Sequence, residues 1–157
     1  MEQVAAKDSF SIFRKTYALL VNPGKESVFM SFRMNPDPKS GKHFPKETQT
    51  TFNLDEAEIL EFVKVMDGLL KGKDAKREWI HDPAAGTEEA GSEIKTLTLA
   101  LADHGIMIRL HLKTRDNQQT YTLILNKFEA MHLNLKIKLW FYEMQIGTKT
   151  GFTYNWI

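Results

Sequence analysis

Basic, aromatic and hydroxyl side chains occupy every second position in two stretches of this chain of 157 residues. Arg109, His111 and Lys113 alternate with apolar residues, and Phe29 and Arg33 alternate with apolar residues in an earlier stretch. Alternation with a period of two places such residues on one face of a β-strand. Cations that contact phosphates and flat rings that stack on bases are what a single-stranded polynucleotide requires of a protein surface. The two stretches therefore predict nucleic-acid-binding faces.

Each stretch has a simpler interpretation that the sequence leaves open. Arg109, His111 and Lys113 would also suit an ordinary solvated face, because most exposed strand faces carry charge. The Phe29 ring would also suit a packing position under the loop at residues 35–45, which holds three prolines.

Catalytic and metal-binding patterns are missing from the sequence. The five histidines, which include His81 and His132, show no metal-ligand spacing. There is no nucleophile elbow and no phosphate-binding glycine loop. Neighbouring strand residues point to opposite faces, so His81 and Asp82 do not easily form an acid–base pair. We expect no enzymatic activity, no cofactor and no metal.

The elements that carry these residues repeat. Residues 48–56 and 120–129 each read as a Thr-rich strand that runs into a helix, and Asn53 and Asn126 would cap the two helices with a Glu three residues later. Such a unit, repeated, predicts an α+β fold. We expect strands within Phe10–Val21, Ser27–Met34, Gln49–Phe52, Lys76–His81, Ile94–Leu101, Ile106–Lys113 and Thr120–Leu125, and helices from Leu54 to Leu70 and from residue 126 to about Gln145.

The second helix is apolar on two sides, whereas a helix packed only on its own sheet needs one apolar stripe. Two stripes predict a second partner, most simply another copy of the chain; burial within one larger core is the alternative. One stripe holds Phe128, Met131, Leu135, Leu139 and Tyr142. We assign the contact between copies to the other stripe, which holds Leu133, Ile137, Trp140, Phe141 and Met144.

Composition and charge set further expectations. The chain has no cysteine and no apolar run long enough to span a membrane. Residues 51–93 hold eleven acidic and five basic residues, whereas the flanking regions are basic. The sheets would thus be positive and the first helix negative. No targeting signal is evident, so we expect a cytoplasmic or nucleoid-associated protein, or one in the host cytoplasm if it is viral.

Several motifs together resemble the Whirly family. F-S-I-F-R-K-T-Y-A-L-L-V at Phe10–Val21 is similar to that family's first-strand motif Y-x-I-Y-K-G-K-A-A-L-x-V. E-W-I-H-D-P at Glu78–Pro83 is similar to its E-F-F-H-D-P, and K-T-L-T-L at Lys95–Leu99 to the strand that follows. The likeness spans Phe10 to Gly147.

The resemblance implies a Whirly/PC4-like fold of two antiparallel four-stranded sheets, each followed by a helix (ββββα-ββββα), in one domain at residues 10–147. It implies a helix-cored homotetramer that binds single-stranded DNA with little sequence preference, in replication, recombination, repair or transcription. At the family's K-G-K motif this chain has Arg14, Lys15 and Thr16, and Tyr17 follows. Arg14 and Lys15 would contact phosphates, and Tyr17 would add a stacking surface.

Two other functions remain open. The fold resemblance extends to the guide-RNA-binding proteins of trypanosomes, so an RNA-binding or annealing factor is one alternative. A protein–protein adaptor is the other, because Phe152, Tyr154 and Trp156 alternate in the tail at residues 148–157. Residues 1–9 are expected to be a flexible N-terminus.

Overall fold

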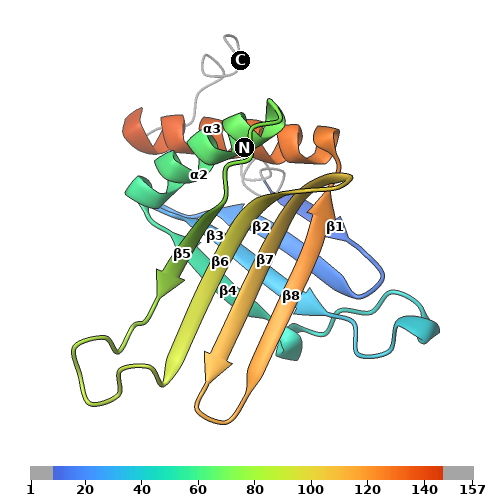
Figure 1. The fold of residues 1–157 in the computed structure, drawn as a ribbon, viewed down its shortest axis with the longest axis vertical. Coiled ribbons are helices and arrows are strands. Elements are labelled where there is room, and N and C mark those ends of the chain that lie inside the picture. Colours follow the sequence, from blue (N-terminus) through green and yellow to red (C-terminus); the bar gives the residue numbers. More distant parts are fainter. Residues whose placement is uncertain (1–8, 147–157) are drawn as a thin grey trace.

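The computed structural model describes residues 9–146 and contains two four-stranded antiparallel sheets, each followed by a helix (Figure 1). Sheet A has the strand order β1-β2-β3-β4 and sheet B the order β5-β6-β7-β8. This confirms the predicted Whirly-type arrangement. The elements are β1 (Phe10–Phe13), β2 (Tyr17–Pro23), β3 (Val28–Met34), β4 (Thr50–Leu54), α2 (Glu56–Leu70), β5 (Arg77–His81), β6 (Glu93–Ala102), β7 (Gly105–Thr114), β8 (Gln118–Leu125) and α3 (Lys127–Ile146), with short 3₁₀ turns η1 (Pro38–Ser40) and η2 (Lys46–Thr48).

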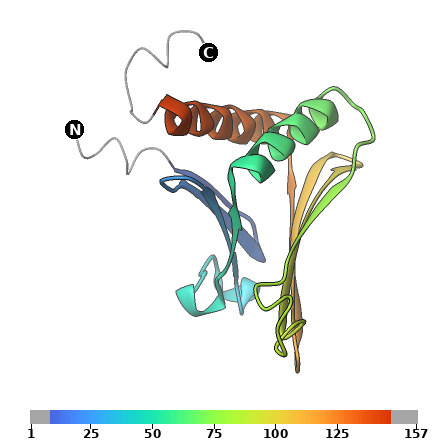
Figure 2. The ribbon, with the colours of Figure 1, turned by 90° about the vertical axis from the view of Figure 1, so that its left-hand side faces the viewer.

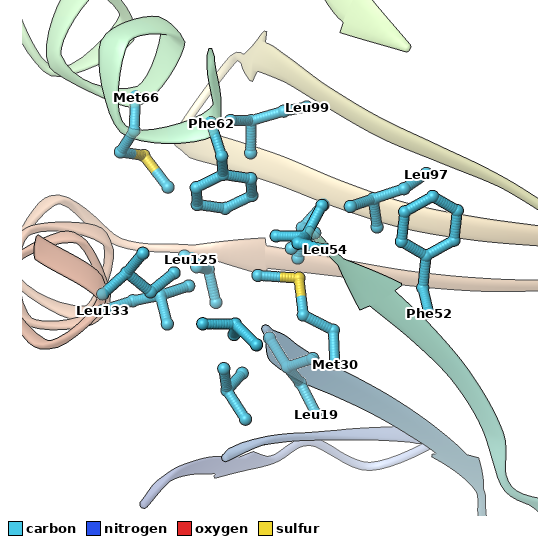
Figure 3. Close-up of a cluster of buried hydrophobic side chains, with 14 of the residues drawn as sticks. Leu19, Met30, Phe52, Leu54, Phe62, Met66, Leu97, Leu99, Leu125 and Leu133 are labelled. Carbon is cyan, nitrogen blue, oxygen red and sulfur yellow. The ribbon is translucent and has the colours of Figure 1, made fainter. Parts of the chain in front are cut away.

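The two sheets face each other, and the two helices lie together across one end of them (Figure 2). The inner faces are apolar, and the alternation that places apolar residues there is clear in β7, where Ile106, Ile108 and Leu110 are buried. Figure 3 shows where the layers meet: Phe62 and Met66 of α2 lie near Leu99 of sheet B. One core therefore joins both sheets and both helices.

The first strand region differs from the single extended run expected at Phe10–Val21. The chain turns between Phe13 and Tyr17, where the Arg14 N–H donates to the Tyr17 carbonyl at 2.9 Å. β1 and β2 then pair antiparallel, with Phe10 opposite Val21 and Phe13 opposite Ala18. The residues Arg14, Lys15 and Thr16 therefore form a hairpin turn and not the middle of a strand.

Of the two predicted helix caps, the one at the start of α3 is confirmed and the one at the start of α2 is not. Asn126 accepts from the Glu129 N–H, and the Glu129 carboxylate accepts from the Asn126 N–H, as predicted. The predicted cap at Asn53 is wrong, because β4 continues to Leu54 and Asp55 forms the reciprocal pair with Glu58. Each helix still begins directly after its sheet with the same type of cap.

The apolar stripe of α3 that was assigned to a contact between copies packs mainly inside the protomer. Leu133, Ile137 and Trp140 are almost fully buried, so they have no surface left for a partner and the assignment is wrong for these three. Phe141 and Met144 are partly buried against the same core. The stripe left exposed is the other one, which begins at Phe128.

No helix within residues 9–146 is long and apolar enough to cross a membrane.

Candidate nucleic-acid interface

The outer face of sheet A, turned away from sheet B, carries the predicted Phe29 and Arg33. The strand register puts Phe29 in a row with Asn22 and Asn53, and puts Arg33 opposite Ala18, two rows away. Between them, the hydroxyls of Ser31 and Thr51 lie 2.9 Å apart. An aromatic ring, two hydroxyls and a cation thus follow one another along this face.

Phe29 does not pack under the proline-rich loop. Its ring lies instead against the β2–β3 turn, where a Cβ atom added to Gly24 would come within 2.6 Å of the ring. The side chain is 37% exposed. The ring is therefore supported from one side and open to solvent, as a stacking surface must be.

Arg33 has a fixed position and no carboxylate partner within the described residues. Its Nε donates to the Gln49 side-chain oxygen at 2.8 Å. Since this uses one of five donors, the rest of the guanidinium is available to a phosphate.

A pair of aromatic rings that the sequence analysis did not select lies at the other end of the same face. Phe13 stands opposite Ala18, in the row of Arg33, and its ring lies 5.6 Å from that of Phe44, centroid to centroid. Phe13 is 44% exposed. Phe44 comes from the loop before β4, so only the folded chain brings the rings together. In the sequence, the alternation of Phe13 with apolar Ile12 was the one pattern that indicated an outward-facing Phe13.

Asn35, a buried polar residue, bonds both to that loop and to the β1–β2 turn. Its side-chain nitrogen donates to the carbonyls of Lys15, at 3.2 Å, and Gly41, at 2.7 Å, while its oxygen accepts from the Asp37 N–H at 3.0 Å. The loop that carries Phe44 is thus tied to the β1–β2 turn.

The outer face of sheet B carries Arg109 and His111 in an open hollow of about 580 Å³. The His111 ring nitrogen Nδ1 lies 2.8 Å from the Thr120 hydroxyl, and the Arg109 Nε donates to the Thr122 hydroxyl at 3.4 Å. Lys113 lies two residues further along β7 and is exposed. The hollow is lined by Glu78, Ile80, Thr96, Thr98, Arg109, His111, Thr120 and Thr122.

The predicted residues of the β1–β2 turn take different roles. Arg14 donates to the Glu129 carboxylate at 2.5 Å and to the Ile124 carbonyl at 3.0 Å, so it joins sheet A to the start of α3. The Arg14 hydrogen bond is the main reason that the pKa of Glu129 lies below its usual value. Lys15 is exposed. The charge of Arg14 is thus neutralised, while that of Lys15 is available.

Tyr17 lies on the inner face of sheet A, opposite Met34, and not on the face of Phe29. Its ring meets the edge of the Tyr121 ring of sheet B at a centroid distance of 6.0 Å. Tyr17 therefore cannot join Phe29 in one stacking surface.

The predicted residues consequently form two groups and not one site. Because the sheets meet through their inner faces, the outer faces point away from each other (Figure 2). Phe29 and Arg33 belong to one face, and Arg109, His111 and Lys113 to the other.

The cations near α2 differ from those of the outer faces because they pair with acidic residues of α2. Arg77 pairs with Glu61 at 2.9 Å, and the His81 ring pairs with Glu58 at 2.8 Å. Hydrogen bonds from Trp79 and then Arg77 hold the pKa of Glu61 below its usual value. Within residues 9–146, no group of three or more His, Asp or Glu side chains is arranged to hold a metal ion.

Comparisons with known proteins identify the fold. The chain superimposes on WHY3 from Arabidopsis thaliana with a TM-score of 0.73 at 18% identity, covering 88% of each chain. The plant transcriptional regulator PBF-2 gives a TM-score of 0.70 at 17% identity, covering 87% of this chain and 79% of that one. MRP1/MRP2 from Trypanosoma brucei gives 0.57 at 13% identity, covering 95% and 98%. No protein-family model and no curated protein sequence matches. The chain has a Whirly-type fold.

Proposed function

We propose that this chain is a single-stranded DNA-binding protein that binds across the outer faces of its two sheets with broad sequence tolerance. Its roles would lie in replication, recombination, repair or transcription. One observation carries the proposal: each outer face combines cations that form no ion pair within the described residues with hydroxyls and flat or apolar side chains. The Whirly-type fold and the sequence motifs of that family support it.

Each face offers both parts of the interaction. On sheet A, Phe29 and Phe13 supply ring surfaces, and Arg33 supplies charge. On sheet B, Lys113 supplies charge, and Arg109 supplies guanidinium donors next to rows of threonine hydroxyls. Stacking on a ring is worth about 1–3 kcal/mol per base and accepts any base, which gives tolerance of sequence.

The proposal includes assembly into a homotetramer through α3. Phe128 is 78% exposed, and Met131 and Leu135 follow it on the same exposed stripe. A continuous apolar stripe in water favours association. Helix contacts between copies would leave the outer sheet faces free for nucleic acid, because α3 lies at one end of the sheets (Figure 1).

The experiment is a fluorescence-anisotropy titration of a labelled mixed-sequence DNA strand of about 30 nucleotides, with its duplex and the matched RNA as competitors, at two salt concentrations. We expect tight binding that the duplex does not compete away. Affinity should fall steeply with salt, because each neutralised phosphate releases counterions. Absence of binding at low salt would refute the proposal.

Two variants locate the site within this experiment. Phe29→Ala should lower affinity for all sequences alike, by roughly five-fold or more if one base stacks there. Lys113→Ala should lower the affinity and make its salt dependence shallower by about one phosphate contact. Lys71→Ala, at the exposed C-terminal end of α2, is the control for loss of one charge.

RNA binding is the second candidate, and the similarity to the trypanosome MRP1/MRP2 fold favours it. Equal or tighter binding of the matched RNA would select it. The adaptor alternative depends on Phe152, Tyr154 and Trp156, which lie outside the described residues; a chain that ends at residue 147 and retains DNA binding but loses a protein partner would support that function.

A further inference from the structure

The hollow on sheet B contains an acidic residue where a simple phosphate-binding surface would have none. Glu78 lies in one row with Thr98, Arg109 and Thr122, on four neighbouring strands. Among the described residues, its carboxylate accepts a single, long hydrogen bond, 3.4 Å, from the Thr98 hydroxyl. A carboxylate in the same row as Arg109 repels a phosphate, so this row is suited to some other part of a nucleotide.

We propose that Glu78 and Arg109 form a guanine-selective subsite within the nucleic-acid interface. This inference rests on the proposed function and names the base that the face prefers. A carboxylate has two acceptor oxygens, and a guanidinium has paired donors. Guanine has adjacent donors at N1–H and N2–H₂ on one edge, and acceptors at N7 and O6 on another, which a guanidinium contacts at both atoms.

The other bases fit this pair less well. Adenine and cytosine present one amino donor beside a ring-nitrogen acceptor, and that acceptor would face the carboxylate. Thymine and uracil present a single N–H between two carbonyl oxygens. Only guanine supplies two neighbouring donors to Glu78 together with two acceptors to Arg109.

The dimensions of the hollow agree with a base lying flat on the sheet. Glu78 is on β5 and Arg109 on β7, so their backbones are about 9.6 Å apart, two strand spacings. Thr98 of β6 lies between them, 4% exposed, and provides a floor. In the next row Ile80 is 64% exposed and supplies apolar surface beside the base.

The subsite would act only on unpaired guanine. In a duplex, N1–H and N2–H₂ are already bonded to cytosine, so Glu78 would meet no free donor. The same pair of residues thereby favours single strands over duplexes and guanine over the other bases.

The test compares two labelled 12-nucleotide strands by anisotropy titration, one of thymidine alone and one with a single central guanosine. A third strand carries inosine, which lacks the N2 amino group. We expect the guanosine strand to bind at least about five-fold more tightly than the thymidine strand, the discrimination typical of a two-bond contact to a base edge. The inosine strand should lose most of that gain.

Glu78→Gln is the decisive variant. Removing a negative charge should maintain or raise the affinity for the thymidine strand, whereas the ratio of guanosine to thymidine affinity should fall toward one. Glu88→Gln, which makes the same charge change in the loop after β5, should keep the wild-type ratio. Circular dichroism and thermal melting of both variants show that a lost ratio is not a lost fold.

Three results would overturn the inference. One is a wild-type ratio of one with tight, salt-sensitive binding of the thymidine strand, which leaves the proposed function intact. Another is an unchanged ratio in Glu78→Gln. The third is displacement of the strand by micromolar guanosine monophosphate, which would make the hollow a site for a free nucleotide. Absence of binding to either strand would remove the proposed function and this inference together.

Discussion

The ring of Phe29 lies on the backbone of Gly24, so closely that a Cβ atom at Gly24 would be 2.6 Å from the ring carbon Cε2. The two residues are on the same hairpin, one in the turn and one at the start of β3. The absence of a side chain at Gly24 is thus what allows the ring to lie where it does.

Gly24→Ala should therefore weaken binding of single-stranded DNA without unfolding the protein, because the ring must move from its place. The loss should approach that of Phe29→Ala, within the range of about 1–3 kcal/mol for one stacked base. Anisotropy titration measures it. Gly68→Ala is the control, since the nearest atom to its added Cβ would be 3.9 Å away. Wild-type affinity in Gly24→Ala would show that the ring position does not matter.

Arg14 and Glu129 predict a pH-dependent contribution to stability. The pKa of Glu129 is lowered in the folded state, chiefly by the Arg14 hydrogen bond, so the ionised form is favoured. The contribution is present above the unfolded pKa of about 4.3 and is lost as pH falls through the folded pKa. Glu129→Gln should cost about 0.5–1.5 kcal/mol at pH 7 and less at pH 3.

Urea unfolding of Glu129→Gln at the two pH values measures this difference. Glu26→Gln, at an exposed turn position, is the control and should match the wild type at both. An equal loss at pH 7 and pH 3 would mean that charge on Glu129 contributes nothing.

Tyr121 links the two sheets through its hydroxyl. It donates to the Thr48 carbonyl at 2.7 Å, lies 2.9 Å from the Thr50 hydroxyl, and is 1% exposed. Tyr121→Phe should lower the free energy of unfolding by about 1–3 kcal/mol, because buried groups lose their partner. Tyr17→Phe is the matched control, since the Tyr17 hydroxyl has no hydrogen bond within residues 9–146. Equal urea midpoints for the two variants would contradict the prediction.

The exposed stripe of α3 predicts which substitution would disrupt the proposed homotetramer. Leu135→Glu should place a charge in an apolar contact and shift the protein toward smaller species in light scattering after size exclusion. Leu60→Glu, at an exposed leucine of α2, should leave the mass unchanged. A wild-type mass for Leu135→Glu would exclude this stripe as the interface.

Local patterns predicted the architecture because the signals were short-range. The alternation around Ile108 and Arg109 identified β7, and the Asn126 cap placed the start of α3 to within a residue. The cap at Asn53 was predicted wrongly because Asp55 and Glu58 have the same spacing as Asn53 and Glu56. Only the length of β4 determines which of the two pairs caps α2.

Contacts between residues far apart in the chain could not be predicted from the sequence pattern. Both sides of α3 are apolar, so periodicity could not say whether Leu133 or Phe128 faces the core. The pairing of Phe13 with Phe44 depends on a loop held by Asn35, and the pairing of Arg14 with Glu129 joins residues from opposite halves of the chain. The Arg14–Glu129 contact exists only after the two halves of the chain have docked.

Every strand pairs with its neighbour in the chain, and neither sheet borrows a strand from the other half. The sequence separation between paired strands is therefore small, which favours rapid pairing during folding. Yet the apolar side of each sheet is covered only when the other half of the chain packs against it. The two halves should therefore unfold in a single cooperative transition, and a fragment cut near residue 75 should not fold as a soluble monomer.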